Sequence, residues 1–238
     1  IYRERGPDET WLFAAGMTGV ATLLAACIPR GLGRVESPPE RIGFLHPAAI
    51  LPGSVLFLGL IGFTGFTAFV PLYVDEIGME DAGPIFFAYG TIVLAVRILG
   101  ARIPDRFGPV RTSTFALVAI LIGISTVAAL ASPTGLWIGT VLLSIGMSLL
   151  FPALFTLAVN NAPAAERSHA VGTFSLFFDL SQGLGAPVLG ILVTIFGAER
   201  AAFVGGAVMA VGGLVLANTR LRAATAVTPA RSGTQHTP

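Results

Sequence analysis

The sequence predicts an all-α fold, a polytopic bundle of seven transmembrane helices, and three observations lead to this prediction. Hydrophobic residues make up 54% of the 238 residues and charged residues only 11%, against about a quarter in soluble domains. The mean hydropathy is +0.81, and the charges are gathered in short islands between long apolar runs. Because these runs do not alternate polar and apolar residues, they are typical of helices and not of membrane β-strands.

Seven apolar stretches are long enough to cross a membrane. A span needs roughly 17 to 25 mostly apolar residues, because about 30 Å of hydrocarbon is crossed at 1.5 Å per residue. The fourth and fifth stretches are separated only by the turn signal SPTG, and the sixth and seventh only by residues 197–200. The stretches are residues 11–28, 48–74, 83–99, 112–131, 136–159, 170–196 and 201–219.

The connections divide the chain into four predicted parts. Residues 1–28 carry one helix, and residues 29–47, which contain ESPPER, read as a long linker. Residues 48–222 carry a six-helix bundle, and residues 223–238, rich in Thr, Ala, Pro and Ser, are expected to form a disordered tail. Because the chain begins at Ile1 and one helix stands before the linker, we expect it to be truncated, with further helices preceding it.

The arginines predict the orientation in the membrane, since the chain has no lysine. The connections after the first, third and fifth stretches, together with the tail, hold eleven of the fourteen arginines, and the opposite side holds three. This bias predicts a multi-pass protein of the cell (inner) membrane with a cytoplasmic C-terminus. The eleven are Arg30, Arg34, Arg41, Arg97, Arg102, Arg106, Arg111, Arg167, Arg220, Arg222 and Arg231; the three are Arg3, Arg5 and Arg200.

The charged stretch RILGARIPDRFGPVR, residues 97–111, lies in the connection between the second and third helices of the six-helix block. It resembles the loop signature of the major facilitator superfamily, roughly G-G-x-L-A-D-R-x-G-R-R. Ala101, Pro104 and the pair Pro109-Val110 depart from it, while the Asp-Arg core is intact. The positions that match are Gly100, Asp105, Arg106, Phe107, Gly108 and Arg111.

This resemblance implies the C-terminal half, helices six to twelve, of a twelve-helix secondary transporter. Residues 151–190 look like the tenth and eleventh helices of bacterial efflux-type members. The resemblance also implies a gating loop at Gly100, Asp105, Arg106, Gly108 and Arg111, in which Asp105, Arg106 and Arg111 stabilise one conformation. The alternative is that these basic residues only fix the topology.

Asp179 is the only acid inside any of the seven stretches. Nine residues from the start of its stretch place it about 14 Å deep. A carboxylate at this depth costs about 2.5 to 3.5 kcal/mol to insert, so it must face a cavity, hold a partner or be protonated. Ser175 and Gln182 share its helical face, and Pro187 is expected to bend the helix just beyond it. We expect a proton or substrate pathway here; the alternative is a structural hydrogen bond.

Further pathway candidates lie on two other stretches. Arg97 shares a helical face with Tyr89, and it either snorkels to the surface or pairs with an acid outside this chain. Ser144 and Ser148 lie one turn apart and either line a lumen or form interhelical hydrogen bonds.

The sequence excludes several classes of function. No nucleophile with its base, metal-ligand cluster or phosphate-binding loop stands out, so we expect no enzyme, no cofactor and no metal. No basic stripe indicates a nucleic-acid partner. We expect a secondary active transporter of a small molecule, embedded in the lipid bilayer, with protons as coupling ion and efflux as direction. The alternatives are a sugar or metabolite proton symporter of the same fold, and a channel or scaffold.

Overall fold

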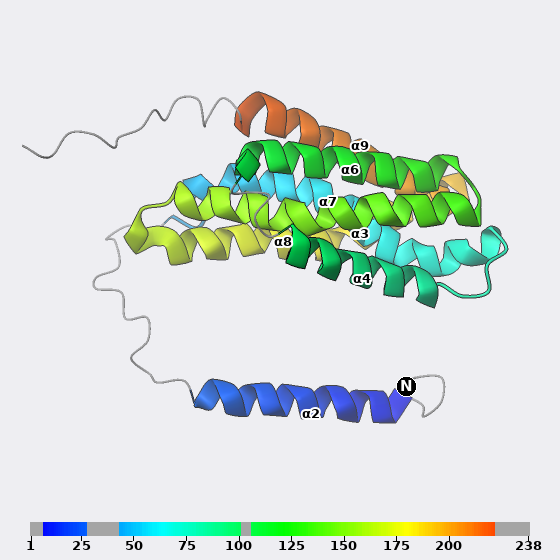
Figure 1. Ribbon diagram of the computed structural model, residues 1–238, viewed down its shortest axis with the longest axis horizontal. Coiled ribbons are helices and arrows are strands. Elements are labelled where there is room, and N and C mark those ends of the chain that lie inside the picture. Colours follow the sequence, from blue (N-terminus) through cyan, green and yellow to red (C-terminus); the bar gives the residue numbers. More distant parts are fainter. Residues whose placement is uncertain (1–6, 28–42, 101–105, 222–238) are drawn as a thin grey trace, which may run out of the picture. The chain divides into compact units, whose positions relative to one another are not determined.

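The computed structural model describes residues 7–27, 43–100 and 106–221, and the regular structure in these ranges is helical. The chain divides into two compact units, Ile1–Pro39 and Glu40–Pro238. The first holds α2 (Pro7–Ala26), and the second holds the other helices, which run side by side in Figure 1. These are α3 (Pro47–Glu76), α4 (Gly83–Leu99), α6 (Pro109–Ala129), α7 (Pro133–Asn160), α8 (Arg167–Phe196) and α9 (Arg200–Leu216), with the short turns η1 (Ala164–Glu166) and η2 (Ala217–Leu221). The predicted all-α fold with seven long helices is confirmed.

Five helical segments of the described ranges are long and apolar enough to cross a membrane. They are Pro47–Glu76, Pro109–Ala129, Pro133–Asn160, Ala164–Phe196 and Arg200–Leu221. Helix α4, with 17 residues, and the segment Ala15–Leu24 of α2 are apolar but shorter. The seven predicted spans therefore include five of full length, and α4 has the bounds that the sequence predicted, with Gly100 as its C-cap.

Four helices, α2, α3, α6 and α7, begin earlier than the apolar runs predict, and each has a proline at its first position. Proline has no N–H to leave unpaired there, and its φ suits the first turn. In α7 this proline is Pro133, and the Ser132 side chain accepts a hydrogen bond from the Gly135 N–H at 3.2 Å. The predicted SPTG turn is therefore wrong in extent, since its last three residues already belong to α7.

Helix α3 occupies the middle of the six-helix unit, where it packs against α8, α9 and α7. Helix α6 packs against α7 and α9, and α4 packs against α7. Tyr73 of α3 is completely buried, and its hydroxyl donates to the Val127 carbonyl of α6 at 3.2 Å. Phe203 of α9 meets the Tyr73 ring edge-on, with ring centroids 5.1 Å apart. One aromatic side chain thus joins three helices.

Two pairs of glycines bring helix backbones together. A Cβ atom on Gly206 of α9 would lie 2.7 Å from the Gly62 Cα of α3. A Cβ atom on Gly123 of α6 would lie 2.8 Å from the Gly139 carbonyl oxygen of α7. Small residues at helix crossings allow this close approach, which increases van der Waals contact between membrane helices.

Helices α4 and α8 are the least buried of the six. Ile85 is the only buried residue among the 17 of α4, and α8 buries six of its 30 residues. Each of these helices therefore turns one side away from the described bundle.

Candidate functional site

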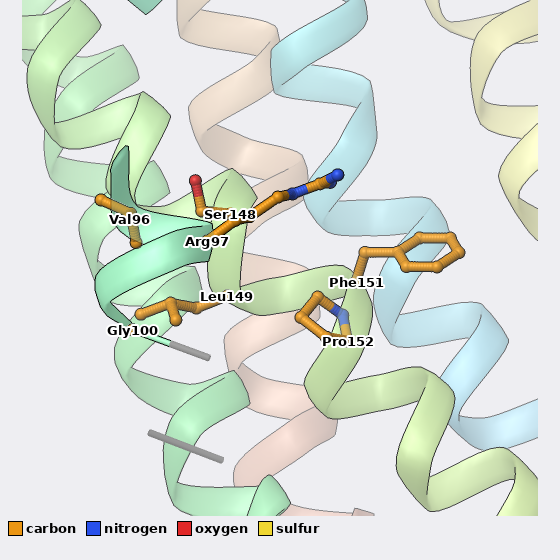
Figure 2. A pocket seen from close by; sticks show the side chains of 7 residues that line it. All are labelled: Val96, Arg97, Gly100, Ser148, Leu149, Phe151 and Pro152. Carbon is orange, nitrogen blue, oxygen red and sulfur yellow. The ribbon is translucent and has the colours of Figure 1, made fainter. Parts of the chain in front are cut away.

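A cavity of about 390 Å³ opens between α4 and α7, and Figure 2 shows the side chains that line it. Among these described residues Arg97 carries the only charge, while Ser148 adds a hydroxyl and the rest are apolar. In Figure 2 the Arg97 side chain extends from α4 past Ser148, toward the side of α7 that carries Phe151. The lining consists of Val96, Arg97, Gly100, Ser148, Leu149, Phe151 and Pro152.

Arg97 lies in the last turn of α4 with an exposed side chain. Within the described part of the chain no carboxylate lies within ion-pair distance of it. Tyr89, two turns earlier, is partly buried and stacks on Phe63 of α3, with centroids 5.2 Å apart and planes 23° apart. The predicted α4 face therefore combines an aromatic ring held against α3 with a guanidinium in the cavity.

Ser144 and Ser148 are both buried. Ser144 Oγ donates to the Thr140 carbonyl at 2.6 Å, and Ser148 Oγ donates to the Ser144 carbonyl at 2.7 Å. Ser148 Oγ also lies 3.5 Å from the Val93 carbonyl of α4. The two serines therefore have different environments in the structure. Ser148 lines the cavity and approaches α4, whereas Ser144 lies inside the bundle.

Helix α8 carries the predicted polar stripe on one side. Ser175, Asp179 and Gln182 are all exposed in this chain. The Gln182 Oε1 atom accepts a hydrogen bond of 2.7 Å from the Thr64 hydroxyl of α3, which is buried. Asp179 has no hydrogen bond or ion pair to any described residue. Helix α8 continues through Pro187 to Phe196.

Phe151 connects the cavity to the α8 stripe. Its ring lines the cavity and also meets Phe178 of α8 edge-on, with centroids 5.8 Å apart. Phe178 directly precedes Asp179. A second ring of α8, Phe174, lies 5.4 Å from Phe151 between centroids. The cationic cavity and the acid-bearing helix therefore flank the same aromatic side chain.

The predicted gating loop is described only in part, because Asp105 lies outside the described residues. Gly100 is buried and follows the end of α4, and Arg106 and Arg111 are exposed. Gly108 has φ +81°, a conformation that favours glycine, and it directly precedes Pro109 at the start of α6. Arg111 lines a separate hollow of about 360 Å³ with Phe107, Thr112, Phe115 and Leu149.

Sequence reasoning missed a polar cluster where α3 begins. His46 Nε2 lies 2.9 Å from Glu166 Oε2, and the backbone N–H of His46 donates to Thr173 Oγ1 at 2.9 Å. The His169 ring meets the His46 ring edge-on at 5.4 Å between centroids. No sequence signal could have shown this, because 120 residues separate His46 from Glu166. In the described chain no group of three or more His, Cys, Asp or Glu could hold a metal ion.

Comparison of the sequence with known proteins identifies the family to which the chain belongs. The sequence profile of the Major Facilitator Superfamily matches residues 5–186 and, a second time, residues 105–236. The chain belongs to the major facilitator superfamily. It is 30% identical over 186 residues to an uncharacterised MFS-type transporter of Salmonella typhimurium, covering 77% of this chain and 48% of that protein. It is 34% identical over 180 residues to an uncharacterised MFS-type transporter of Pseudomonas aeruginosa, covering 75% and 44%.

The chain spans about half the length of these major facilitator relatives. Among solved structures, a peptide transporter superposes with a TM-score of 0.66 at 22% identity, covering 76% of this chain and 39% of that one. At this identity the likeness concerns the fold, which is that of a major facilitator transporter. The chain is a multi-pass membrane protein of a family of transporters, and not of enzymes.

Proposed function

We propose that this chain is the C-terminal half of a secondary active transporter that moves a small molecule by alternating access. Family membership and relatives named as transporters support this proposal. In the proposed division, α2 is the last helix of the N-terminal half, and the six helices from α3 to α9 form the second bundle. Two bundles that rock around a site at the bilayer midplane then expose it to each side in turn.

The exposure of Asp179 is the observation on which the proposal depends. This acid lies near the middle of the 30-residue helix α8 and is exposed in the described chain. Ionised acids inside membranes face a bundle interior or a water-filled cavity, because lipid cannot solvate the charge. The α8 stripe therefore needs protein or water against it, as a second bundle and a central cavity would provide.

Proton coupling is the finer part of the proposal. Asp179 takes up a proton or pairs with a cationic group in one conformation and releases it in the other. Gln182, one turn further along α8, accepts a hydrogen bond from Thr64 of α3. A movement of α8 would therefore also displace α3 in the middle of the bundle. Efflux is the proposed direction, the inner membrane the proposed location, and the tail lies in the cytoplasm.

The experiment compares Asp179→Asn with wild type in the full-length protein. Cells that express it are loaded with a panel of fluorescent amphipathic dyes, and dye retention is measured with and without a protonophore. We expect the wild type to lower the retention of at least one dye, the protonophore to abolish this effect, and Asp179→Asn to do the same. The matched control Asp75→Asn changes an exposed acid at the end of α3 and should retain wild-type efflux.

Two outcomes would contradict parts of this proposal. Efflux by Asp179→Asn that still responds to the protonophore would remove Asp179 from the coupling step. Inward accumulation of a nutrient driven by protons would favour the sugar or metabolite symporter instead.

A further inference from the structure

A second hollow lies apart from the cavity between α4 and α7, and the two share no lining residue. Its volume is about 670 Å³, and it lies between α8 and α9, with Ala128 of α6 at one side. Its walls are apolar apart from one cation, Arg200, at the start of α9. The other lining residues are Val188, Leu189, Leu192, Phe196, Ala198, Ala201, Val204, Gly205, Val208 and Met209.

Small residues of α9 create this hollow, here called the α8–α9 groove. Ala201 and Gly205 lie one turn apart on the lining face of α9. A Cβ atom on Gly205 would lie only 2.5 Å from Leu192 Cδ1, so α8 approaches α9 closely at the floor of the groove. Val204 and Val208, one turn apart on α9, also line it and remain exposed, at 53% and 64%. The groove is therefore an open channel along the outside of two helices.

The length of the groove matches one leaflet of a bilayer. Its lining runs along α9 from Arg200 to Met209, nine residues or about 14 Å at the helical rise. Half of the hydrocarbon core measures about 15 Å. A chain that enters beside Arg200 would therefore end near the midplane of the membrane.

The cation at the mouth remains partly available. Arg200 Nε lies 3.3 Å from Glu76 Oε1 of α3, and the Arg200 side chain is still 42% exposed. The contact does not have the geometry of a hydrogen bond, and the buried Nε–H has no acceptor among the described residues. An arginine with spare donors at the level of the headgroups matches a phosphate, since guanidinium donors and phosphate oxygens are complementary.

We propose that the α8–α9 groove binds one phospholipid, with an acyl chain along Val204 and Val208 and the headgroup phosphate at Arg200. The apolar walls, as long as one leaflet, suit an acyl chain, and the single cation at the end, Arg200, suits the negatively charged phosphate. This site is independent of the transport function proposed above. In the orientation expected from the arginines, it opens to the leaflet on the non-cytoplasmic side.

The test uses the full-length protein, purified in detergent, freed of lipid and titrated with dioleoyl phosphatidylglycerol in native mass spectrometry. We expect one retained lipid, which Arg200→Gln weakens about fivefold, or about 1 kcal/mol, as one basic side chain near a phosphate provides. Glu76→Gln breaks the same ion pair but keeps the cation, so it should bind at least as well as wild type. Dioleoylglycerol, which has the same tails but no phosphate, should not respond to Arg200→Gln.

A second pair of variants tests the groove itself. Val204→Trp fills it and should abolish retention of both lipids, whereas Val215→Trp lies outside the lining on an equally exposed position of α9 and should not. Equal weakening by Arg200→Gln and Glu76→Gln would overturn the phosphate assignment, because it would show a structural role of the ion pair. A photo-crosslinker at Val204 should capture phospholipid in membranes, and capture of a peptide of the same protein would overturn the proposal.

Discussion

At the scale of single residues, the hydroxyl groups along α7 are satisfied by the backbone of their own helix. Thr140, Ser144 and Ser148 each donate to the carbonyl four residues earlier in α7, at 2.7, 2.6 and 2.7 Å. A hydrocarbon environment offers no water to accept these protons, so the helix backbone accepts them. Ser148 Oγ can then only accept from a ligand in the cavity, and Arg97 is left as the donor.

Arg97 gives the first prediction. Arg97→Gln should lower transport by the full-length protein at least about tenfold, because a hydrogen bond to a charged group contributes roughly 1.5 to 3 kcal/mol. Initial rates for a dye identified by the efflux assay provide the measurement. The control Arg167→Gln changes an exposed arginine at the start of α8. Unchanged rates in Arg97→Gln would show that this side chain only snorkels to the surface.

Thr64 gives a prediction about stability. Thr64→Val removes the 2.7 Å hydrogen bond to Gln182 while keeping nearly the same volume. Hydrogen bonds between membrane helices contribute about 0.6 kcal/mol on average and at most about 1.7, so we expect a loss in this range. Thr67→Val removes only a bond within α3, to the Thr64 carbonyl, and should cost less. Thermal unfolding in detergent measures both, and equal losses would show that the contact between α3 and α8 contributes nothing.

At the scale of helices, boundaries and crossings depend on different residues. Proline and a capping side chain fix where a helix begins, as Ser132 and Pro133 do for α7. Glycine fixes how closely two helices cross, as Gly62 and Gly206 do for α3 and α9. The first feature is local in the chain, whereas the second requires two positions more than 140 residues apart to meet.

The crossing of α3 and α9 gives the third prediction. Gly206→Ala would place a methyl group 2.7 Å from the Gly62 Cα, and because that neighbour is backbone the helices must separate. We expect a loss of about 1 to 3 kcal/mol, as overpacking costs in other cores. Gly212→Ala meets only Leu58 Cδ1, at 3.8 Å, and should be neutral or gain up to about 1 kcal/mol from better helix propensity. Greater stability of Gly206→Ala than of Gly212→Ala would contradict this packing.

At the scale of the whole molecule, the sides of α4 and α8 that this chain leaves uncovered hold the polar groups of the candidate site. Arg97 and Asp179 both lie there, on different helices that each pack beside α7. The ionised Asp179, near the middle of α8, would be costly against hydrocarbon, so the uncovered side of α8 needs protein or water against it. In the proposed function, these uncovered sides of α4 and α8 would form one half of the transport pathway, and the chain spans about half the length of its relatives.

Orientation gives the fourth prediction, since eleven of fourteen arginines are expected on the cytoplasmic side. In a variant of the full-length protein without other cysteines, Glu80→Cys should react with a membrane-impermeant maleimide added to intact cells. Ser168→Cys should react only after the membrane is opened. Both positions are exposed, so accessibility depends on the side of the membrane. The reverse pattern would place the tail outside.

The site could be predicted in part from the sequence. The face shared by Ser175, Asp179 and Gln182 follows from helical spacing alone, and the structure leaves all three exposed. The role of Gln182 as acceptor for Thr64 could not be predicted, because 118 residues separate the two. The two serines of α7 also look equivalent in the sequence, and only the approach of α4 distinguishes Ser148 from Ser144.

The sequence by itself determined that this chain is a helical membrane protein, and its loop signature indicated the family. These properties depend on composition and on neighbours along the chain, because a helix satisfies its own backbone and hydrocarbon demands apolar residues. The tertiary structure decided which polar side chains come together: Arg97 and Ser148 line one cavity, Thr64 is hydrogen-bonded to Gln182, and His46 lies against Glu166. Such contacts arise where helices distant in the sequence cross, and their positions are set by packing and not by local pattern.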